Sequence, residues 1–148
     1  MYEAIKLAEQ SIENGGGPFG AVIVHDDNIV AKASNQVVLK HDPTAHAEVE
    51  AIRAACETLK THKLDQCTIY SSSEPCPMCL GAVYWAHIDQ LFYGSSRRSV
   101  KQVGFDDQYI YDEIDLSDSE RKIKTSQHLE TEASKVLAKW NRLLTTNI

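Results

Sequence analysis

The chain has 148 residues, of which 43% are hydrophobic and 24% charged, so its composition excludes an intrinsically disordered protein. No apolar run approaches the roughly 18 residues that a membrane-spanning helix needs. The formal net charge of −6 argues against a basic nucleic-acid-binding protein and favours a small-molecule substrate. We therefore expect a single domain over residues 1–148, with no membrane and no nucleic acid among its partners.

The first 35 residues predict a helix followed by a β-hairpin. Apolar residues recur at helical spacing over residues 2–14, and the Gly-Pro segment 15–18 ends that helix. Two β-like runs, 19–25 and 29–35, flank the turn-forming residues 26–28. A phosphate-binding loop needs the order strand, glycines, helix, so this glycine run is not interpreted as one.

The rest of the chain alternates helices and strands. Asp42 as N-cap and Pro43 at the first position predict a helix over residues 43–59. The later elements are a strand at 68–71, a helix at 76–86, a strand at 91–93 and an amphipathic C-terminal helix at about 128–148. A hairpin followed by alternating helices and strands predicts an α/β fold with a mixed sheet.

Two separated motifs, His46-Ala47-Glu48 and Pro75-Cys76-Pro77-Met78-Cys79, predict a catalytic zinc site. His46, Cys76 and Cys79 supply one imidazole and two thiolates, which suit zinc better than magnesium or calcium. Three protein ligands leave a fourth position for water, as catalytic zinc sites do. The pattern H-x-E followed by P-C-x-x-C is the signature of zinc nucleobase deaminases.

Other interpretations of these residues explain less of the sequence. A thioredoxin-like Cys76/Cys79 redox pair gives no reason for a distant H-x-E motif. A structural zinc needs a fourth ligand, whereas Cys56 is expected inside a helix and Cys67 at the start of a strand. A zinc-binding protein without turnover would have no use for Glu48.

The expected chemistry is hydrolysis by a zinc-bound hydroxide. Zinc lowers the pKa of bound water from 15.7 to about 7, so hydroxide is available at neutral pH. Glu48 is badly placed as a fourth ligand and well placed to carry protons between water, a ring nitrogen and the departing ammonia.

The chain resembles the cytidine deaminase-like superfamily in several motifs. These are Phe19-Gly20-Ala21-Val22-Ile23-Val24, Asn35, Asp42-Pro43-Thr44-Ala45-His46-Ala47-Glu48-Val49 and Glu74-Pro75-Cys76-Pro77-Met78-Cys79-Leu80-Gly81-Ala82. Within it, Tyr84-Trp85-Ala86 and the segment 104–111 are similar to bacterial guanine deaminases. The resemblance implies a three-layer α/β/α fold with a five-stranded mixed sheet, one Zn²⁺ per subunit, and hydrolysis of guanine to xanthine and ammonia.

The resemblance also assigns substrate contacts. It implies that Asn35 hydrogen-bonds the purine, that Phe19 stacks on it, and that Ala47 and Trp85 line its pocket. Asp107 would face the amino group and act as a second proton carrier. A carboxylate accepts hydrogen bonds only, which suits the adjacent ring N–H and exocyclic amine of guanine.

The resemblance to guanine deaminases implies a domain-swapped homodimer in which the C-terminal helix closes the partner's site. The first residues lack the basic start and apolar stretch of a signal peptide, so we expect a cytoplasmic protein. The chain ends at Leu143-Leu144-Thr145-Thr146-Asn147-Ile148, without the terminal aromatic residue of related enzymes. Free base and nucleoside therefore remain alternative substrates. The rival activities on this scaffold are guanosine, tRNA adenosine and aminotriazine deamination.

Overall fold

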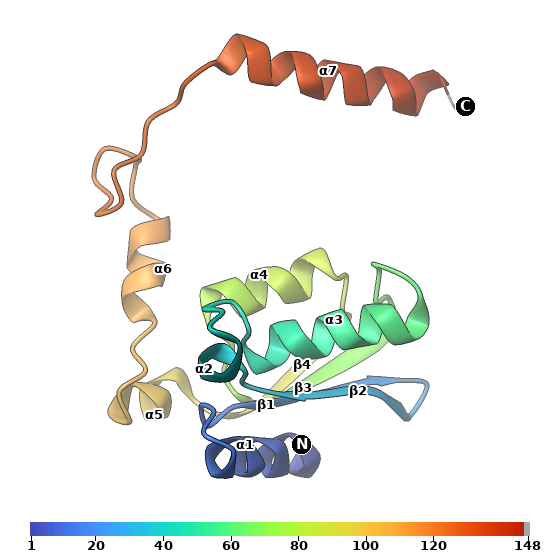
Figure 1. Ribbon diagram of the computed structural model, residues 1–148, viewed down its shortest axis with the longest axis vertical. Coiled ribbons are helices and arrows are strands. Elements are labelled where there is room, and N and C mark those ends of the chain that lie inside the picture. The colour runs from blue at the N-terminus through green and yellow to red at the C-terminus, as the bar shows by residue number, and fades with distance from the viewer. Residues whose placement is uncertain (147–148) are drawn as a thin grey trace. The chain divides into compact units, whose positions relative to one another are not determined.

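The structure is a computed structural model that describes residues 1–146; Asn147 and Ile148, the end of the predicted C-terminal helix, lie outside the described residues. The chain forms two compact units, Met1–Ile110 and Tyr111–Ile148. Figure 1 shows the elements of both units, which are considered separately below.

The first unit contains a mixed four-stranded sheet in the order β2-β1-β3-β4. Its strands are β1 (Gly20–His25), β2 (Asn28–Ser34), β3 (Cys67–Ser73) and β4 (Gln90–Ser95). β1 pairs antiparallel with β2 and β3, whereas β3 and β4 are parallel. The predicted hairpin is confirmed: Asp26 and Asp27 at its tip have φ of 48° and 61°, the left-handed backbone of a tight hairpin turn.

The expectation of five strands was wrong for the described residues. After β4 the chain forms two short helices, α5 (Arg97–Gln102) and α6 (Gln108–Ile114), and no further strand within the described residues. The side chain of Ser96 accepts a hydrogen bond from the backbone N–H of Ser99, which caps α5. Residues 97–102 are mostly polar and lack the alternation of a half-buried strand, so local sequence favours a helix here.

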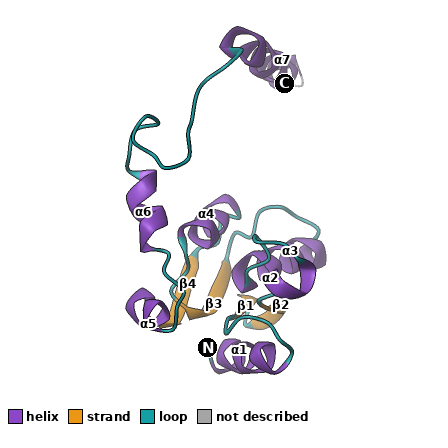
Figure 2. Cartoon of the chain, turned by 60° about the vertical axis from the view of Figure 1, so that its left-hand side comes forward, coloured by secondary structure: helices purple, strands orange, loops and turns teal. Residues whose placement is uncertain are grey.

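Helices cover both faces of the sheet, which confirms the three-layer α/β/α arrangement (Figures 1 and 2). Helix α1 (Tyr2–Glu13) lies on one face, and α3 (Ala47–Leu59) and α4 (Pro77–Trp85) on the other. The backbone of Gly20 runs so close to α1 that an added Cβ would lie 2.3 Å from the carbonyl oxygen of Ala4. The core contains Ile23, Leu64 and Ile69, each fully buried.

The third helix begins later than Asp42 and Pro43 predict. Helix α3 starts at Ala47 with His46 as its N-cap, and a one-turn helix, α2 (Val37–Lys40), precedes the connecting loop. The carboxylate of Asp42 instead accepts hydrogen bonds from the backbone N–H and hydroxyl of Thr44, at 2.8 and 2.7 Å. It closes a local turn in this loop rather than capping the helix.

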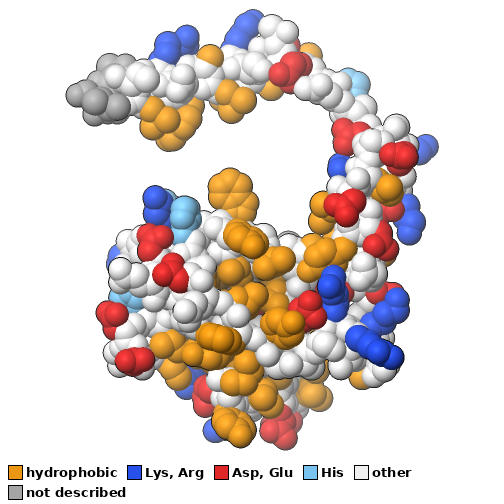
Figure 3. Space-filling view, turned by 180° about the vertical axis from the view of Figure 1, so that it is seen from behind, with side chains coloured by type: hydrophobic (Ala, Val, Ile, Leu, Met, Phe, Trp, Pro, Cys, Tyr) orange, Lys and Arg blue, Asp and Glu red, His pale blue; other side chains and the backbone are white. Residues whose placement is uncertain are grey.

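The second unit contains α7 (Glu130–Thr146), which confirms the amphipathic C-terminal helix but starts it at residue 130. Its apolar residues lie along one side, as Figure 3 shows, and include the exposed side chains of Leu137, Trp140 and Leu143. Over the described residues, no helix has both the length and the apolar character that a bilayer span requires.

Candidate active site

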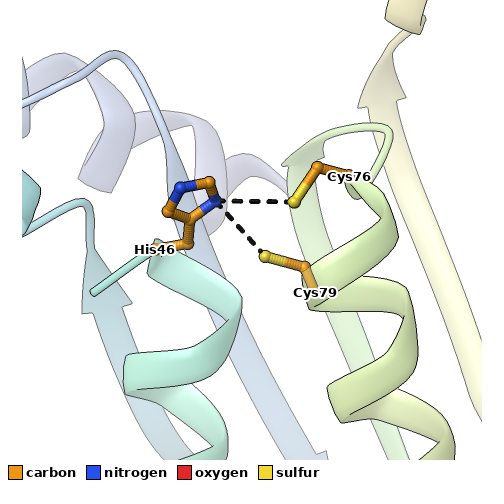
Figure 4. A group of neighbouring side chains, drawn as sticks. All are labelled: His46, Cys76 and Cys79. Atoms are coloured by element: carbon orange, nitrogen blue, oxygen red, sulfur yellow. Dashed lines mark hydrogen bonds between the residues drawn. The ribbon is translucent and has the colours of Figure 1, made fainter. Parts of the chain in front are cut away.

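Two helix N-termini bring the predicted metal ligands together. His46 is the N-cap of α3, Cys76 is the N-cap of α4, and Cys79 lies in the first turn of α4. The Nδ1 atom of His46 lies 3.6 Å from Sγ of Cys76 and 3.5 Å from Sγ of Cys79. The three side chains point toward one common position (Figure 4).

The spacing of these donor atoms fits a tetrahedral zinc ion. With a Zn–N bond of about 2.1 Å, a Zn–S bond of about 2.3 Å and tetrahedral angles, nitrogen and sulfur ligands are about 3.6 Å apart. Both measured N–S distances agree with this value to within 0.1 Å. One imidazole and two thiols are a soft donor set, which selects zinc over magnesium and calcium.

The environment of the two cysteines favours one thiolate even before a metal binds. Hydrogen bonds from the thiol of Cys79 and from His46 lower the pKa of Cys76 to about 4. The hydrogen bond that Cys79 donates to Cys76, together with burial, raises the pKa of Cys79. The hydrogen bond between His46 and Cys76 raises the pKa of His46. A dication between the three groups would displace the remaining protons, since thiolates and neutral imidazole are the zinc ligands.

Glu48, the second residue of α3, is the buried carboxyl group of the site. Its side chain is only 5% exposed, and its Oε1 accepts a hydrogen bond of 3.0 Å from the hydroxyl of Ser71 on β3. Burial raises the pKa of Glu48 because desolvation penalises the carboxylate. A carboxyl group with a raised pKa can both take up and release a proton near neutral pH.

A cavity of about 840 Å³ opens over these residues. It is lined by His46, Glu48 and Cys76 and by residues from the 12–19 segment, from α2 and from the segment 100–110. Most of the wall is apolar, as is usual for pockets that hold a flat heterocycle. The pocket therefore places a small substrate directly over the metal ligands.

Three of the predicted substrate contacts line this cavity: Phe19, Asn35 and Asp107. Asn35 is buried, and its Oδ1 accepts a hydrogen bond of 3.2 Å from the backbone N–H of Val37. This leaves its amide NH₂ group to donate. Asp107 is half-buried, and burial raises the pKa of its carboxyl group.

Two other predicted contacts do not line the cavity. Ala47 is fully buried in the first turn of α3, and Trp85, at the end of α4, is 84% exposed. Within a single chain, Trp85 is therefore directed to solvent and away from the residues of the cavity.

Phe105 and Glu74 are among the cavity residues that sequence reasoning missed. The rings of Phe105 and Phe19 meet edge to face, with centroids 5.0 Å apart and an interplanar angle of 84°. Glu74 directly precedes the Pro75-Cys76 pair, and its carboxylate lies 3.5 Å from the guanidinium of Arg97. The sequence signal for Glu74 was its place in the motif that contains Cys76 and Cys79, two residues before Cys76.

Comparison with known proteins agrees with this geometry. The family model of the cytidine and deoxycytidylate deaminase zinc-binding region matches residues 1–95, which include all three metal ligands and Glu48. The chain belongs to this family. Membership and donor set together identify zinc as the cofactor of the deaminase site.

Individual deaminases differ in how similar they are to this chain. Guanine deaminase of Bacillus subtilis (strain 168) is 49% identical over 141 residues, covering 95% of this chain and 90% of that protein. An X-ray structure of B. subtilis guanine deaminase has a TM-score of 0.93 at 47% identity and covers 95% of this chain and 90% of that one. A tRNA-specific adenosine deaminase of Buchnera aphidicola subsp. Baizongia pistaciae is 36% identical over 139 residues, covering 93% of this chain and 83% of that protein.

Proposed function

We propose that this deaminase hydrolyses guanine to xanthine and ammonia. The observation that carries the proposal is the position of Asp107, whose carboxylate lines the same cavity as His46, Cys76 and Glu48. Identity of 49% with a guanine deaminase over nearly the whole chain supports the same substrate.

The residues of the cavity divide the work between proton transfer and recognition. Zinc held by His46, Cys76 and Cys79 would act as a Lewis acid and lower the pKa of a bound water to about 7. Glu48 takes up a proton from the attacking water at its carboxylate, releases it to a ring nitrogen of guanine and assists protonation of the leaving amine. The hydrogen bond from Ser71 holds Oε1 of Glu48 in place during these transfers.

Recognition of guanine falls to three residues that line the cavity, Asp107, Asn35 and Phe19. Asp107 accepts hydrogen bonds from the ring N–H and the exocyclic amine, which adenine cannot both supply because its corresponding ring nitrogen is an acceptor. The amide NH₂ group of Asn35 donates to an acceptor on the purine, and Phe19 packs against its ring. Ala47 has only backbone polar groups to offer a substrate.

An ammonia-release assay on the zinc-loaded protein tests the proposal. The substrates are guanine, guanosine, adenine, cytosine, cytidine and the aminotriazine ammeline. We expect guanine to have the highest kcat/KM and adenine to be turned over far more slowly. Faster turnover of ammeline or of a pyrimidine than of guanine would overturn the assignment.

Guanosine is the second candidate substrate, because the cavity is large. Its volume of about 840 Å³ lies near the upper end of the range for drug-sized ligands and exceeds what an eleven-atom purine base requires. A kcat/KM for guanosine above that for guanine would assign the protein as a nucleoside deaminase. Adenosine in tRNA is less favoured, because the chain has a net charge of −6 and presents a carboxylate to the base.

We also propose that the active form is a homodimer in which the helix α7 of one subunit closes the site of the other. Exposed apolar side chains on α7, including Leu137 and Trp140, support this assembly. Tyr84 and Trp85 at the end of α4 are also exposed, as apolar side chains at a protein–protein interface are in the isolated subunit. Trp85 would then line a pocket only in the assembled dimer.

A cytoplasmic location is proposed on the chemistry of the cysteines. Cys56, Cys67, Cys76 and Cys79 are all free thiols. Reduced thiols, two of them zinc ligands, suit a reducing compartment. Cell fractionation that finds the protein with secreted or periplasmic material would contradict this assignment.

A further inference from the structure

Glu74 links the zinc-binding loop to the segment that carries Asp107. It follows β3 directly and precedes Pro75 and Cys76, so it belongs to the same short stretch as a metal ligand. Its backbone N–H donates to the carbonyl of Ser95 at 2.8 Å, which continues the parallel pairing of β3 with β4. The backbone of Glu74 is therefore fixed by the sheet.

The side chain of Glu74 makes two contacts with one residue. Its Oε2 accepts a hydrogen bond of 2.9 Å from the backbone N–H of Arg97, and its Oε1 lies 3.5 Å from Nη2 of the same arginine. The side chains of Glu74 and Arg97 are 24% and 32% exposed, so the pair is partly shielded from water. Arg97 is the first residue of α5, and these contacts attach the start of α5 to the zinc-binding loop.

From Arg97 the segment folds back on itself to reach Asp107. The backbone N–H of Phe105 donates to the carbonyl of Val100 at 3.3 Å, and Lys101 pairs with Asp106 at 2.8 Å. A second cavity, of about 390 Å³, is lined by residues that include Glu74, Arg97 and Asp107. These three residues therefore lie close together. The contacts of Phe105 and Lys101 connect the start of the segment to Asp107.

We propose that Glu74 is a positioning residue. By holding Arg97 it fixes the segment 97–107, and this segment determines the position of Asp107 relative to the zinc ligands. The proposal rests on the proposed function, since it gives Asp107 the role of guanine acceptor. Glu74 acts through another residue and need not touch the substrate. Displacing a catalytic or binding group by about 1 Å is enough to reduce turnover by about 10²-fold.

Three variants of the full-length protein test this role. Glu74→Ala removes both contacts with Arg97, whereas Glu74→Gln keeps an acceptor oxygen for the backbone N–H of Arg97. Glu57→Gln, an exposed glutamate on α3, is the matched control for loss of one negative charge. Each variant is measured for zinc content, thermal stability, kcat and KM for guanine, and hydrogen exchange of the backbone amides 97–107.

We expect Glu74→Ala to keep full zinc content and to raise KM, with kcat/KM lower by about 10²-fold. The amide of Arg97 should exchange faster in this variant. Glu74→Gln should retain kcat/KM within about tenfold of the wild type, and Glu57→Gln should match it. A general loss of folding would instead lower zinc content and kcat together and leave KM unchanged, which overturns a positioning role.

Two further outcomes also overturn the inference: unchanged kcat/KM in Glu74→Ala, or unchanged exchange at Arg97. The failure of the proposed function is distinguishable from either. Suppose that the wild type does not deaminate guanine while Glu74→Ala still shows faster hydrogen exchange of the amides 97–107. In that case Glu74 does hold the segment, and the substrate assignment is wrong.

Discussion

At the scale of single residues, the buried carboxyl of Glu48 forms hydrogen bonds with Ser71 and with the metal ligand Cys79. The hydroxyl of Ser71 donates to its Oε1, and His46, two residues before it in the chain, is one of the metal ligands. Because Glu48 is not one of the three converging donors, its removal should leave the metal site intact.

We predict that Glu48→Ala binds one zinc per subunit and loses turnover of guanine by about 10²–10⁴-fold, the usual worth of general acid–base catalysis. Zinc is measured by elemental analysis and turnover by ammonia release. As a control, Glu57→Gln should change neither quantity. A Glu48→Ala protein that loses zinc, or that keeps a wild-type rate, contradicts the assigned role.

Asp107 gives a prediction about pH. Burial raises the pKa of its carboxyl group above 3.8, and the negative charges of Cys76 and Glu74 add to this while Arg97 opposes it. Asp107 accepts both hydrogen bonds from guanine only when it is ionised. The kcat/KM for guanine should therefore fall as the pH decreases through this raised pKa, so the acid limb lies above pH 3.8.

The variant Asp107→Asn identifies the source of that limb. An amide replaces one acceptor by a donor, which opposes a donor of guanine and costs about 1–3 kcal/mol, or roughly 5- to 150-fold in kcat/KM. Zinc content should not change. A pH profile with the wild-type acid limb in this variant would assign the limb to another group and make Asp107 a turn residue.

At the scale of elements, the packing of α1 on the sheet depends on Gly20. A Cβ at this position would lie 2.3 Å from the carbonyl oxygen of Ala4 and 2.7 Å from the backbone nitrogen of Ala8. Both are backbone atoms of α1, so the helix would have to move away from β1. Gly81 in α4 is a suitable contrast, since a Cβ there would meet nothing within 4 Å.

We predict that Gly20→Ala lowers the free energy of unfolding by about 1–3 kcal/mol, as overpacking does. Gly81→Ala should be neutral or raise it by up to about 1 kcal/mol, since alanine is the better helix former. Urea unfolding of the zinc-loaded proteins measures both. Equal stability of the two variants would mean that α1 adjusts to Gly20→Ala without loss.

The order of the elements could be predicted from local patterns, whereas the ends of some could not. Alternating apolar residues and the Asp-Asp-Asn turn gave the hairpin because its register depends on neighbours in sequence. The predicted start of α3 was wrong because an aspartate can cap a helix or close a turn. The carboxylate of Asp42 accepts hydrogen bonds from Thr44 and so closes a turn. The extended backbone of His46, with ψ of 154°, directs its ring to the cysteines.

The residues of the candidate site also differ in whether the sequence could predict them. His46, Cys76 and Cys79 were predictable because metal ligands have a fixed chemistry and spacing, and Glu48 because the deaminase motif places it two residues after His46. The partnership of Glu74 with Arg97 spans 23 residues and the ring contact of Phe19 with Phe105 joins distant segments, and neither has a sequence period. Such contacts are set by how β3, β4 and α5 meet, which no local pattern records.

At the scale of the whole molecule, α7 has an apolar face that its own unit leaves uncovered. The side chains of Leu137 and Trp140 are 69% and 62% exposed. An apolar stripe of this length on an isolated helix is stabilised by packing against another surface rather than by helix propensity alone. In a symmetric dimer each substitution acts twice, once in each interface.

We predict that Leu137→Glu weakens the dimer, because each copy loses the burial of one leucine, worth about 1.5–3 kcal/mol, and buries a charge instead. The dissociation constant should rise at least about 10²-fold, measured by sedimentation. Turnover at low protein concentration should fall in parallel, because in the proposed dimer the partner's helix closes the site. Lys135→Glu places the same residue on the polar side of α7 and should leave both measurements near wild type. A wild-type protein that sediments as a monomer at full activity would show that α7 covers its own subunit or nothing at all.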